Sequence, residues 1–329
     1  MLKIGIIGVG HLGKIHLKCL QQLHDFYEIK GFYDVSEEEA KKVATQFNIP
    51  SFSSPEALIE QCDVIDVVTP TIYHYEYAEK VLKASKHLFI EKPVCHTIEE
   101  ANALLKLAEE SGSKVQVGHV ERFNPAYLSS AQYIENPMFI EGHRLAEFNP
   151  RGTDVSVVLD LMIHDLDIVL KTVNSEIKKI SASGVAVVSD TPDIANARIE
   201  FHNGCVANLT ASRISLKNMR KIRMFQRDAY ISMDFLEKSS QIVKLKELEG
   251  KPGDFDIVLD LGEGKPKKQI FFQSPECKPN NAIAEELKSF FYSITENKEP
   301  AVSLFDGVSA LKAAHMILEK INESLQILE

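Results

Sequence analysis

Two short stretches of the sequence place polar side chains where they could move a proton. Glu91-Lys92-Pro93 follows the apolar run His87–Ile90, and Asp160 and His164 stand four residues apart inside VVLDLMIHDLDIVL. A lysine amine or an imidazole can exchange a proton with a substrate hydroxyl when burial or a neighbouring charge tunes its pKa. Lys92 and His164, with Asp160 as a neighbour, are therefore candidates for acid–base catalysis.

Both stretches also have a structural interpretation. Glu91 and Lys92 could form a surface ion pair ahead of a proline that ends the strand. The i, i+4 spacing sets Asp160 and His164 on one face of an α-helix, where the two side chains could satisfy each other. We expect no metal site, because one histidine with carboxylates lacks a third ligand in register. Four further histidines lie on different predicted elements and share no ligand spacing: His11, His16, His119 and His143.

A third pattern could hold a dinucleotide. Gly8-Val9-Gly10-His11-Leu12-Gly13 is a GxGxxG motif between an apolar run and a helical pattern. In such a motif the first glycine permits a tight turn, the second lets the backbone approach a pyrophosphate, and the third lets helix and strand pack closely. The N-terminus of the helix favours the anion. We predict that the cofactor is bound by Gly8, Gly10, His11, Leu12 and Gly13.

An acidic residue strengthens this interpretation and selects the cofactor. Asp34 ends the next apolar run, 21 residues after Gly13, where this fingerprint places a carboxylate on the ribose 2′-hydroxyl. The carboxylate would repel the 2′-phosphate of NADP, and Val35-Ser36-Glu37 offers no lysine or arginine to accept one. The alternative is that Asp34 is only a turn residue at a strand end. We predict that the protein binds NAD.

Residues 1–120 have the pattern of a sheet that would bring these groups together. Apolar runs alternate with helical patterns, which indicates an α/β Rossmann domain with a parallel sheet covered on both faces. Ligands bind at the carboxyl ends of such strands. Ser36 with Glu39, and Thr97 with Glu100, predict capping boxes at two helix starts. The predicted strands are Lys3–Gly8, Ile29–Asp34, Val64–Val68, His87–Ile90 and Val115–Gly118.

Residues 121–329 have a different pattern, which predicts an α+β domain for substrate binding and oligomerisation. A helix-like stretch at Asn124–Tyr133 and an apolar helix at Val157–Val173 precede period-two segments, which indicate a mostly antiparallel open sheet. Asn203-Gly204 predicts a hairpin with a primed turn. Two helices, Ala282–Glu296 and Leu304–Leu325, end the chain. We expect the substrate between the two domains.

Composition excludes several classes of protein. The 329 residues carry a formal net charge of −10, which disfavours nucleic-acid and anionic-membrane binding. The five cysteines are odd in number and widely spaced, which disfavours a disulfide framework and indicates a reducing compartment. The apolar start runs directly into the GxGxxG motif and is too short to span a bilayer. We therefore predict a cytoplasmic enzyme.

In order and spacing, these motifs resemble the glucose–fructose oxidoreductase/inositol dehydrogenase (Gfo/Idh/MocA) family over essentially the whole chain. The resemblance implies that Lys92 and His164 act at a substrate hydroxyl and that Asp160 orients them. It also implies that Thr69, His74 and Glu91 lie along the cofactor. For His74, helix capping or packing is an equal alternative. The residues that carry the resemblance are Gly8–Gly13, Thr69-Pro70 with His74, Glu91-Lys92-Pro93, and Asp160 with His164.

Within that family, three segments are similar to enzymes that oxidise the C3 hydroxyl of UDP-N-acetylglucosamine: Val117–Pro125, DLMIHDLDI, and Ser212–Ser215 with Arg220–Phe225. The similarity implies that Arg122, Asn124 and Arg213 hold the sugar or its diphosphate, since an arginine fork suits phosphate. Surface or interdomain ion pairs are the alternative for these residues.

Two other functions stay open at this point. One is dehydrogenation of inositol, a free sugar or another nucleotide sugar. Inositol and free sugars carry no diphosphate, so Arg122 and Arg213 would have no diphosphate to bind in that case. The other is a non-catalytic NAD-binding sensor, which could lose Lys92 and His164 without penalty. We expect a homodimer or homotetramer formed through the sheet of the second domain.

Overall fold

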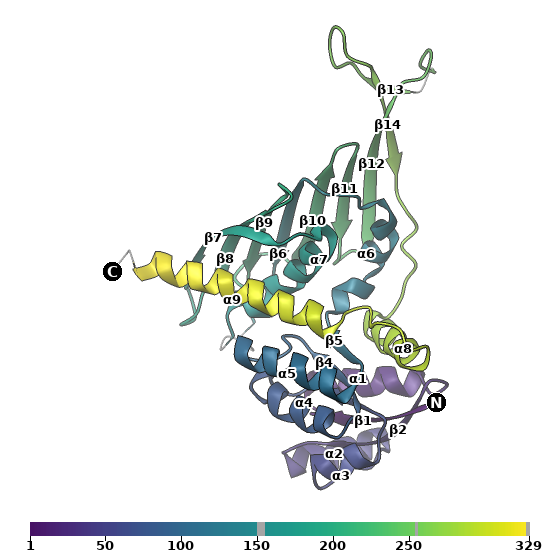
Figure 1. The fold of residues 1–329 in the computed structure, drawn as a ribbon, viewed down its shortest axis with the longest axis vertical. Helices are drawn as coiled ribbons and strands as arrows, with labels where there is room; N and C mark the ends of the chain where they lie inside the picture. The colour runs from purple at the N-terminus through teal and green to yellow at the C-terminus, as the bar shows by residue number, and fades with distance from the viewer. Residues whose placement is uncertain (150–154, 254–255, 327–329) are drawn as a thin grey trace. The chain divides into compact units, whose positions relative to one another are not determined.

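The computed structural model describes residues 1–149, 155–253 and 256–326. By its internal contacts the chain forms two units (Figure 1). The first contains residues 1–123 and 281–312, and the second contains residues 124–280 and those from 313 onward. The sequence pattern predicts one boundary near residue 120, whereas in the structure residues 281–312 group with the first unit.

The first unit is built on a five-stranded parallel sheet with the order β2-β1-β3-β4-β5. All five predicted strands are present, with ends that differ from the prediction by at most two residues. The strands are β1 (Leu2–Ile7), β2 (Tyr27–Tyr33), β3 (Val64–Val67), β4 (His87–Glu91) and β5 (Val115–Gly118). The helices between them are α1 (His11–Gln22), α2 (Glu37–Phe47), α3 (Pro55–Glu60), α4 (His74–Lys83) and α5 (Ile98–Ser111).

Two helix starts test the capping predictions. At α5, Thr97 and Glu100 form the reciprocal capping box that was predicted. At α2, Ser36 caps the Glu39 amide, but the second half of the box is absent. The Glu39 carboxylate pairs with Lys14 instead, and the Ser36 amide donates to Asp34 Oδ1 at 2.9 Å. The predicted box at α2 is therefore wrong in its second half, because both groups have other partners.

Residues 281–312 complete the core of the first unit. Helix α8 (Ala282–Thr295) buries Leu287 and Phe290 fully in the same cluster as the strands. The Tyr27 hydroxyl donates to the Leu287 carbonyl at 2.8 Å, and Gln116 Nε2 donates to the Glu286 carbonyl at 2.7 Å. The first unit is therefore assembled from both ends of the chain.

The second unit is built on a nine-stranded sheet with the order β13-β14-β12-β11-β10-β6-β9-β8-β7. Every neighbouring pair is antiparallel except β6 and β9, which run parallel, so the prediction of a mostly antiparallel sheet is confirmed. The strands are β6 (Phe139–Leu145), β7 (Ile177–Val185), β8 (Ile194–Phe201), β9 (Val206–Ser212), β10 (Met219–Gln226), β11 (Ala229–Asp234), β12 (Ser239–Glu247), β13 (Ile257–Leu259) and β14 (Lys268–Gln273).

The hairpin between β8 and β9 is present, but its turn differs from the prediction. Gly204 has a positive φ of 88°, while Asn203 does not, so the turn is not the primed type that needs a positive φ at both positions. The Gly204 amide donates to the Phe201 carbonyl, and the Phe201 amide donates to the Cys205 carbonyl. This is a type I turn closed by a glycine bulge.

Helices cover one face of the nine-stranded sheet. The predicted helix at Val157–Val173 is a π-helical turn (Val158–Met162) that continues as α7 (Ile163–Val173). The predicted helix-like stretch Asn124–Tyr133 is confirmed: Asn124 caps α6 (Pro125–Ser130), and a 3₁₀-helical turn follows at Ala131–Tyr133. From α9 (Leu304–Gln326), Ala313, Ala314, Ile317 and Ile321 are buried in the core of the second unit.

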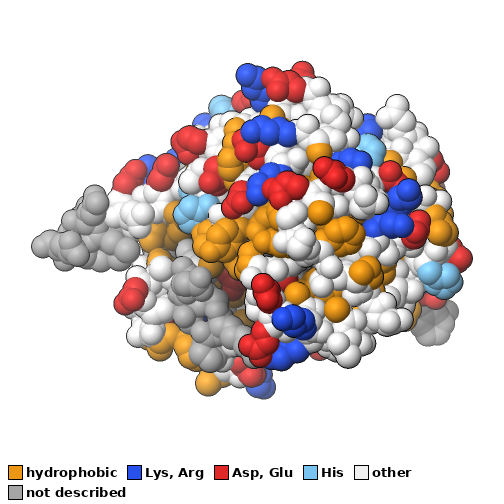
Figure 2. All heavy atoms as spheres, turned by 90° about the horizontal axis from the view of Figure 1, so that it is seen from below, with side chains coloured by type: hydrophobic (Ala, Val, Ile, Leu, Met, Phe, Trp, Pro, Cys, Tyr) orange, Lys and Arg blue, Asp and Glu red, His pale blue; other side chains and the backbone are white. Residues whose placement is uncertain are grey.

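Charge is mixed over the face drawn in Figure 2, where Lys and Arg side chains alternate with Asp and Glu. Among the helices of the described residues, none combines the length and the apolar character that a bilayer crossing requires.

Candidate functional site

The glycine loop after β1 has the shape that a pyrophosphate needs. Gly8 adopts a φ of 93°, and a Cβ there would lie 2.9 Å from the Val68 carbonyl oxygen. A Cβ on Gly13 would lie 2.1 Å from the Gly8 carbonyl oxygen, so only glycine lets α1 start this close to β1. A Cβ on Gly10 would meet nothing within 4 Å, and no side chain caps α1. The uncapped amides of α1 and the open space at Gly10 fit a bound diphosphate.

Asp34 follows β2 and fastens the glycine loop. Its Oδ2 accepts from the Val9 amide at 2.9 Å, and its Oδ1 accepts from the Ser36 amide at 2.9 Å. Each carboxylate oxygen has a second lone pair, and the side chain is only half-buried, so both can still accept ribose hydroxyls. The loop and Asp34 therefore fit NAD.

His74, at the start of α4, joins the ends of two neighbouring strands. Its Nδ1 lies 2.8 Å from the Pro93 carbonyl oxygen, and its Nε2 lies 2.8 Å from the Thr69 carbonyl oxygen. Burial lowers the pKa of His74, against the two carbonyl contacts that raise it. His74 thus ties the segment after β3 to the segment after β4; its predicted contact with the cofactor stays a prediction.

Lys92 follows β4 at the same edge of the sheet and is half-buried. Its peptide bond to Pro93 is cis. The Lys92 amide donates to Glu91 Oε2 at 3.2 Å, so the backbone of the candidate acid–base group is held by its neighbour's carboxylate. The Glu91 side chain itself turns inward and is 7% exposed. This inward direction leaves the predicted contact between Glu91 and the cofactor as a prediction.

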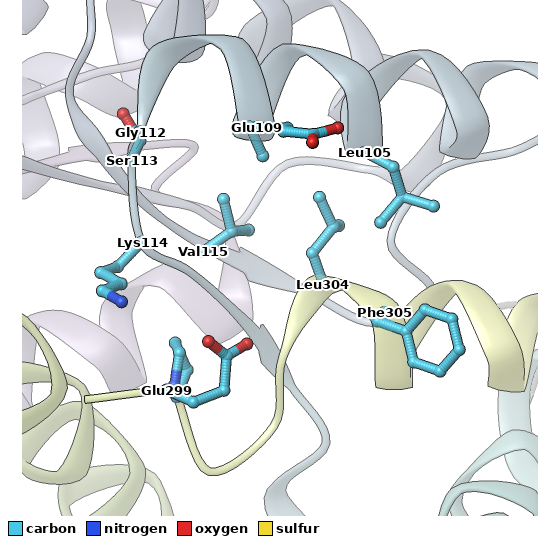
Figure 3. Close-up of a pocket in the computed structure, with 11 residues that line it drawn as sticks. Leu105, Glu109, Gly112, Ser113, Lys114, Val115, Glu299, Leu304 and Phe305 are labelled. Atoms are coloured by element: carbon cyan, nitrogen blue, oxygen red, sulfur yellow. The ribbon is translucent and has the colours of Figure 1, made fainter. Parts of the chain in front are cut away.

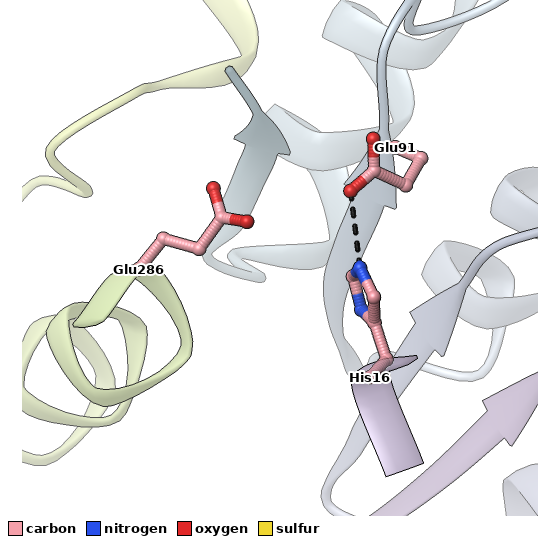
Figure 4. A group of neighbouring side chains, drawn as sticks. All are labelled: His16, Glu91 and Glu286. Atoms are coloured by element: carbon pink, nitrogen blue, oxygen red, sulfur yellow. Dashed lines mark ion pairs between the residues drawn. The ribbon is translucent and has the colours of Figure 1, made fainter. Parts of the chain in front are cut away.

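Behind Lys92 lies a group that the sequence analysis did not find, which we call the buried cluster: His16, Asp66, Glu91 and Glu286. His16 Nδ1 contacts Asp66 Oδ2 at 2.8 Å, and His16 Nε2 contacts Glu91 Oε1 at 3.2 Å. Helix α8 directs the Glu286 side chain toward the other members of the cluster (Figure 4). One side-chain nitrogen of His16 and one carboxylate oxygen each of Glu91 and Glu286 lie within 4.8 Å of one another. His16, Asp66 and Glu286 are fully buried.

The charges in the buried cluster depend on one another. Although burial lowers it, the pKa of His16 is raised well above 6.5 by the Asp66 and Glu91 carboxylates. His16 in turn lowers the pKa of Glu91, against the effect of burial. Burial raises the pKa of Glu286 well above 4.5, and the Glu91 charge adds to this. These shifts favour the charged form of His16 and the protonated form of Glu286.

In the second unit, Asp160 and His164 are both half-buried on the helical segment before and at the start of α7. Asp160 lies within the π-helical turn, so the i, i+4 geometry of a regular α-helix, which the sequence analysis assumed, does not hold there. The next residue, Asp165, accepts from Arg144 Nη2 at 2.7 Å and from Nε at 3.0 Å, with both side chains buried. This pair fastens the segment to β6.

The three predicted substrate residues are buried and have protein contacts. Asn124 caps α6 through its Oδ1 and donates from Nδ2 to the Phe235 carbonyl. Arg122 Nη2 lies 3.9 Å from Asp306, and its residue is 6% exposed. Arg213 donates to the Val155 carbonyl, lies 3.9 Å from Asp193, and is 5% exposed. These contacts give each residue a structural task, and its role at the substrate stays a prediction.

A hollow of about 300 Å³ lies elsewhere in the first unit (Figure 3). It is lined by α5, by the first residues of β5 and by the start of α9, with Glu109, Lys114 and Glu299 as its charged groups. Since it lies at the amino end of β5, it is distinct from the edge where the glycine loop and Lys92 follow the carboxyl ends of their strands.

Two family models match the chain. One, described as an oxidoreductase family with an NAD-binding Rossmann fold, matches residues 2–119, and a GFO/IDH/MocA C-terminal domain matches residues 133–229. A UDP-N-acetylglucosamine 3-dehydrogenase of Acidithiobacillus ferrooxidans is 35% identical over 329 residues, 99% of both proteins. A scyllo-inositol 2-dehydrogenase (NAD⁺) of Bacillus subtilis is 26% identical over 94% of this chain and 93% of its own.

Solved structures agree with this match. The Acidithiobacillus ferrooxidans UDP-N-acetylglucosamine 3-dehydrogenase superposes with a TM-score of 0.87 at 32% identity, covering 97% of each chain. Levoglucosan dehydrogenase in complex with NADH superposes with a TM-score of 0.83 at 19% identity, covering 98% of this chain and 97% of its own. The second likeness concerns the fold alone.

Proposed function

The chain belongs to the Gfo/Idh/MocA family of NAD-binding oxidoreductases, and we propose that within this family it oxidises the C3 hydroxyl of UDP-N-acetylglucosamine. The observation that carries the proposal is the 35% identity to an enzyme of that name over 99% of both proteins. A match of this length includes both units, so it covers the predicted substrate residues as well as the cofactor loop. NAD is the cofactor, because the matching family model describes an NAD-binding Rossmann fold. The N-terminus of α1, which no side chain caps, fits the cofactor diphosphate.

In the proposed reaction, Lys92 Nζ takes the proton of the C3 hydroxyl. The C3–H bond breaks with its electron pair, and the oxygen forms the double bond of a ketone. Bound NAD⁺ supplies the acceptor for the hydride. His164, with Asp160 as its neighbour, orients the hydroxyl toward Lys92, which lowers the barrier by positioning. Asp34 and the glycine loop hold the cofactor through its ribose and its diphosphate.

Support for a nucleotide substrate depends on Arg122 and Arg213. An arginine fork can bind diphosphate oxygens with two parallel hydrogen bonds. Asp306 lies 3.9 Å from Arg122 and Asp193 lies 3.9 Å from Arg213, close enough to hold the two guanidinium groups in place. We propose that both arginines grip the diphosphate and that Asn124 supports the same segment.

A polyol dehydrogenase is the second candidate, and one observation favours it. Arg122 and Arg213 are almost completely buried by protein contacts, an arrangement that a neutral substrate would permit. Relatives named for inositol dehydrogenation match more than nine-tenths of the chain at 23–26% identity. The substrate screen below separates the two candidates.

The test is NADH formation by the purified protein with UDP-N-acetylglucosamine, N-acetylglucosamine, myo-inositol and glucose. We expect turnover with the nucleotide sugar and little or none with the others. Lys92→Met should lose at least about 10²-fold in kcat while it still folds and binds NAD, because it removes the acid–base group alone. Turnover of inositol or glucose without turnover of the nucleotide sugar would replace the proposal with the second candidate. Lys92→Met at wild-type kcat would remove Lys92 from the mechanism.

We also propose that the chain forms a homodimer or homotetramer through the uncovered face of its nine-stranded sheet. Phe139, Phe225 and Tyr230 stand side by side on β6, β10 and β11, with ring centroids 6.0 and 5.0 Å apart. Phe225 is 38% exposed, while its neighbours Ile222 and Met224 are buried on the other face. An aromatic patch of this kind is typical of an association surface. Light scattering should give a dimer or tetramer, and Phe225→Glu should shift it toward monomer.

A further inference from the structure

We propose that the buried cluster is a positioning network for Lys92, in which Asp66 orients His16, His16 holds Glu91, and Glu91 fixes the Lys92 backbone. The inference rests on the proposed catalytic role of Lys92 and extends it to four residues buried in the first unit. Three contacts form the chain, at 2.8 Å for Asp66–His16, 3.2 Å for His16–Glu91 and 3.2 Å for the Lys92 amide to Glu91.

The direction of each group follows from the contact before it. When an imidazole contacts a carboxylate through Nδ1, that contact fixes the orientation of the ring. The direction in which Nε2 points is then fixed as well. Here Glu91 Oε1 lies 3.2 Å from His16 Nε2, at ion-pair distance but without the geometry of a hydrogen bond (Figure 4). Glu91 then has one oxygen on His16 and the other on the Lys92 amide. Contacts at both oxygens restrict the rotation of the carboxylate, and the Lys92 amide that donates to it is restricted with it.

The backbone around Glu91 is shaped for this inward position. A Cβ on Gly118 of β5 would lie 2.6 Å from Glu91 Oε1 and 2.8 Å from its carboxyl carbon. Glycine at this position therefore provides the space that the carboxylate occupies. Any larger residue would push the flexible end of Glu91 away from His16, without changing the charge of the cluster.

Glu286 completes the network as an uncharged acid. Its two carboxyl oxygens have no hydrogen-bond partner among the described residues, although the side chain is fully buried and aimed at Glu91 and His16. A third carboxylate beside one imidazolium would be costly to ionise in this interior. Kept neutral, Glu286 closes the space behind Glu91 and leaves His16 to the Asp66 and Glu91 carboxylates.

The decisive experiment is a double-mutant cycle with UDP-N-acetylglucosamine and NAD. Glu91→Gln should lower kcat by about 10- to 100-fold, with KM for the sugar changed by less than about threefold, because a misplaced acid–base group slows the chemical step. In a Lys92→Met background the same substitution should cost nothing further, since both changes act through one group. Glu110→Gln, on the exposed side of α5, is the matched control and should keep wild-type kcat.

Each result bears on one of the two proposals. If Lys92→Met loses activity while Glu91→Gln keeps it, or if the two losses multiply, the network is overturned and the enzyme assignment stands. If Lys92→Met keeps its activity, both the role of Lys92 and the network fall. Gly118→Ala is the second variant: it retains every charge and should reproduce the kcat loss of Glu91→Gln, whereas wild-type kcat would count against the network.

A measurement without substrate tests the assignment of charges. Glu286 faces His16 and Cys19 of α1, Asp66 of β3 and Glu91 of β4. With a folded-state pKa raised above 4.5, Glu286 binds more proton when folded than when unfolded, so it destabilises the protein progressively as the pH rises above that value. The Tm of Glu286→Gln minus the Tm of the wild type should therefore increase as the pH rises from 5 to 8. A constant difference, or a stoichiometric metal ion in the purified protein, would overturn the assignment.

Discussion

The two units place their candidate catalytic groups by different means. In the first unit, the glycine loop, Asp34 and Lys92 follow the carboxyl ends of parallel strands, and backbone geometry sets their positions. In the second, Asp160 and His164 lie on a helical segment that is irregular at Asp160 and fastened by the buried Arg144–Asp165 pair. The second unit therefore depends on one buried ion pair to hold its candidate groups, whereas the first depends on its strand ends and, at Lys92, on the buried cluster.

The largest effect expected from this difference is on the stability of the second unit. Asp165→Asn removes the carboxylate from a buried arginine and should cost about 3–5 kcal/mol of unfolding free energy. The matched control is Glu141→Gln, which removes the partner of the exposed Arg223 at 2.8 Å and should cost at most about 1 kcal/mol. Denaturant titration of both variants compares them. Equal small losses would mean that the Arg144–Asp165 pair does not anchor the helix.

An intermediate effect is expected on substrate affinity. Arg213→Met should lower the affinity for UDP-N-acetylglucosamine roughly 10- to 150-fold, because it removes charge-assisted hydrogen bonds of about 1.5–3 kcal/mol. NAD affinity, measured on the same preparation by calorimetry, should not change. Arg122→Met should behave in the same way. A variant that loses stability and retains sugar affinity would assign its arginine to the structural contact with Asp193 or Asp306 alone.

The smallest effect concerns the choice of cofactor in the first unit. We expect NAD to bind at least about 10-fold more tightly than NADP, a difference of about 1.4 kcal/mol. Asp34→Ala should narrow this preference, because it removes the carboxylate that repels a 2′-phosphate. The same substitution removes acceptors for the Val9 and Ser36 amides, so NAD affinity should fall as well. Fluorescence titration with both dinucleotides measures the ratio, and tighter NADP binding to the wild type would contradict the argument.

Sequence reasoning was most accurate where the pattern is local. The five parallel strands, the glycine loop and the capping box at Thr97 all depend on residues within a few positions of one another. The reasoning was less accurate where a distant partner decides. The Glu39 carboxylate pairs with Lys14 and does not complete the predicted capping box. The hydrophobic periodicity of Val157–Val173 does not indicate the π-helical turn.

The buried cluster was missed for the same reason, although it left a trace in the sequence. Asp66 is a charged residue inside the otherwise apolar strand β3, and His16 lies on the apolar face of α1. Each on its own suggests an isolated polar residue, and His16 shares no metal-ligand spacing with the other histidines. Their partner Glu286 lies more than two hundred positions away on α8, so that only the folded chain brings the group together.

The return of residues 281–312 to the first unit has a consequence for biosynthesis. A ribosome that has made residue 123 has synthesised all five parallel strands but not α8, which supplies Leu287, Phe290 and the acceptor of the Tyr27 hydroxyl. At ordinary elongation rates the missing helix emerges on the order of 10 seconds later. During that interval the nascent nucleotide-binding unit exposes the apolar surface that α8 will cover. A nascent chain stalled before residue 281 should therefore bind chaperones in preference to a chain that already contains residues 281–312.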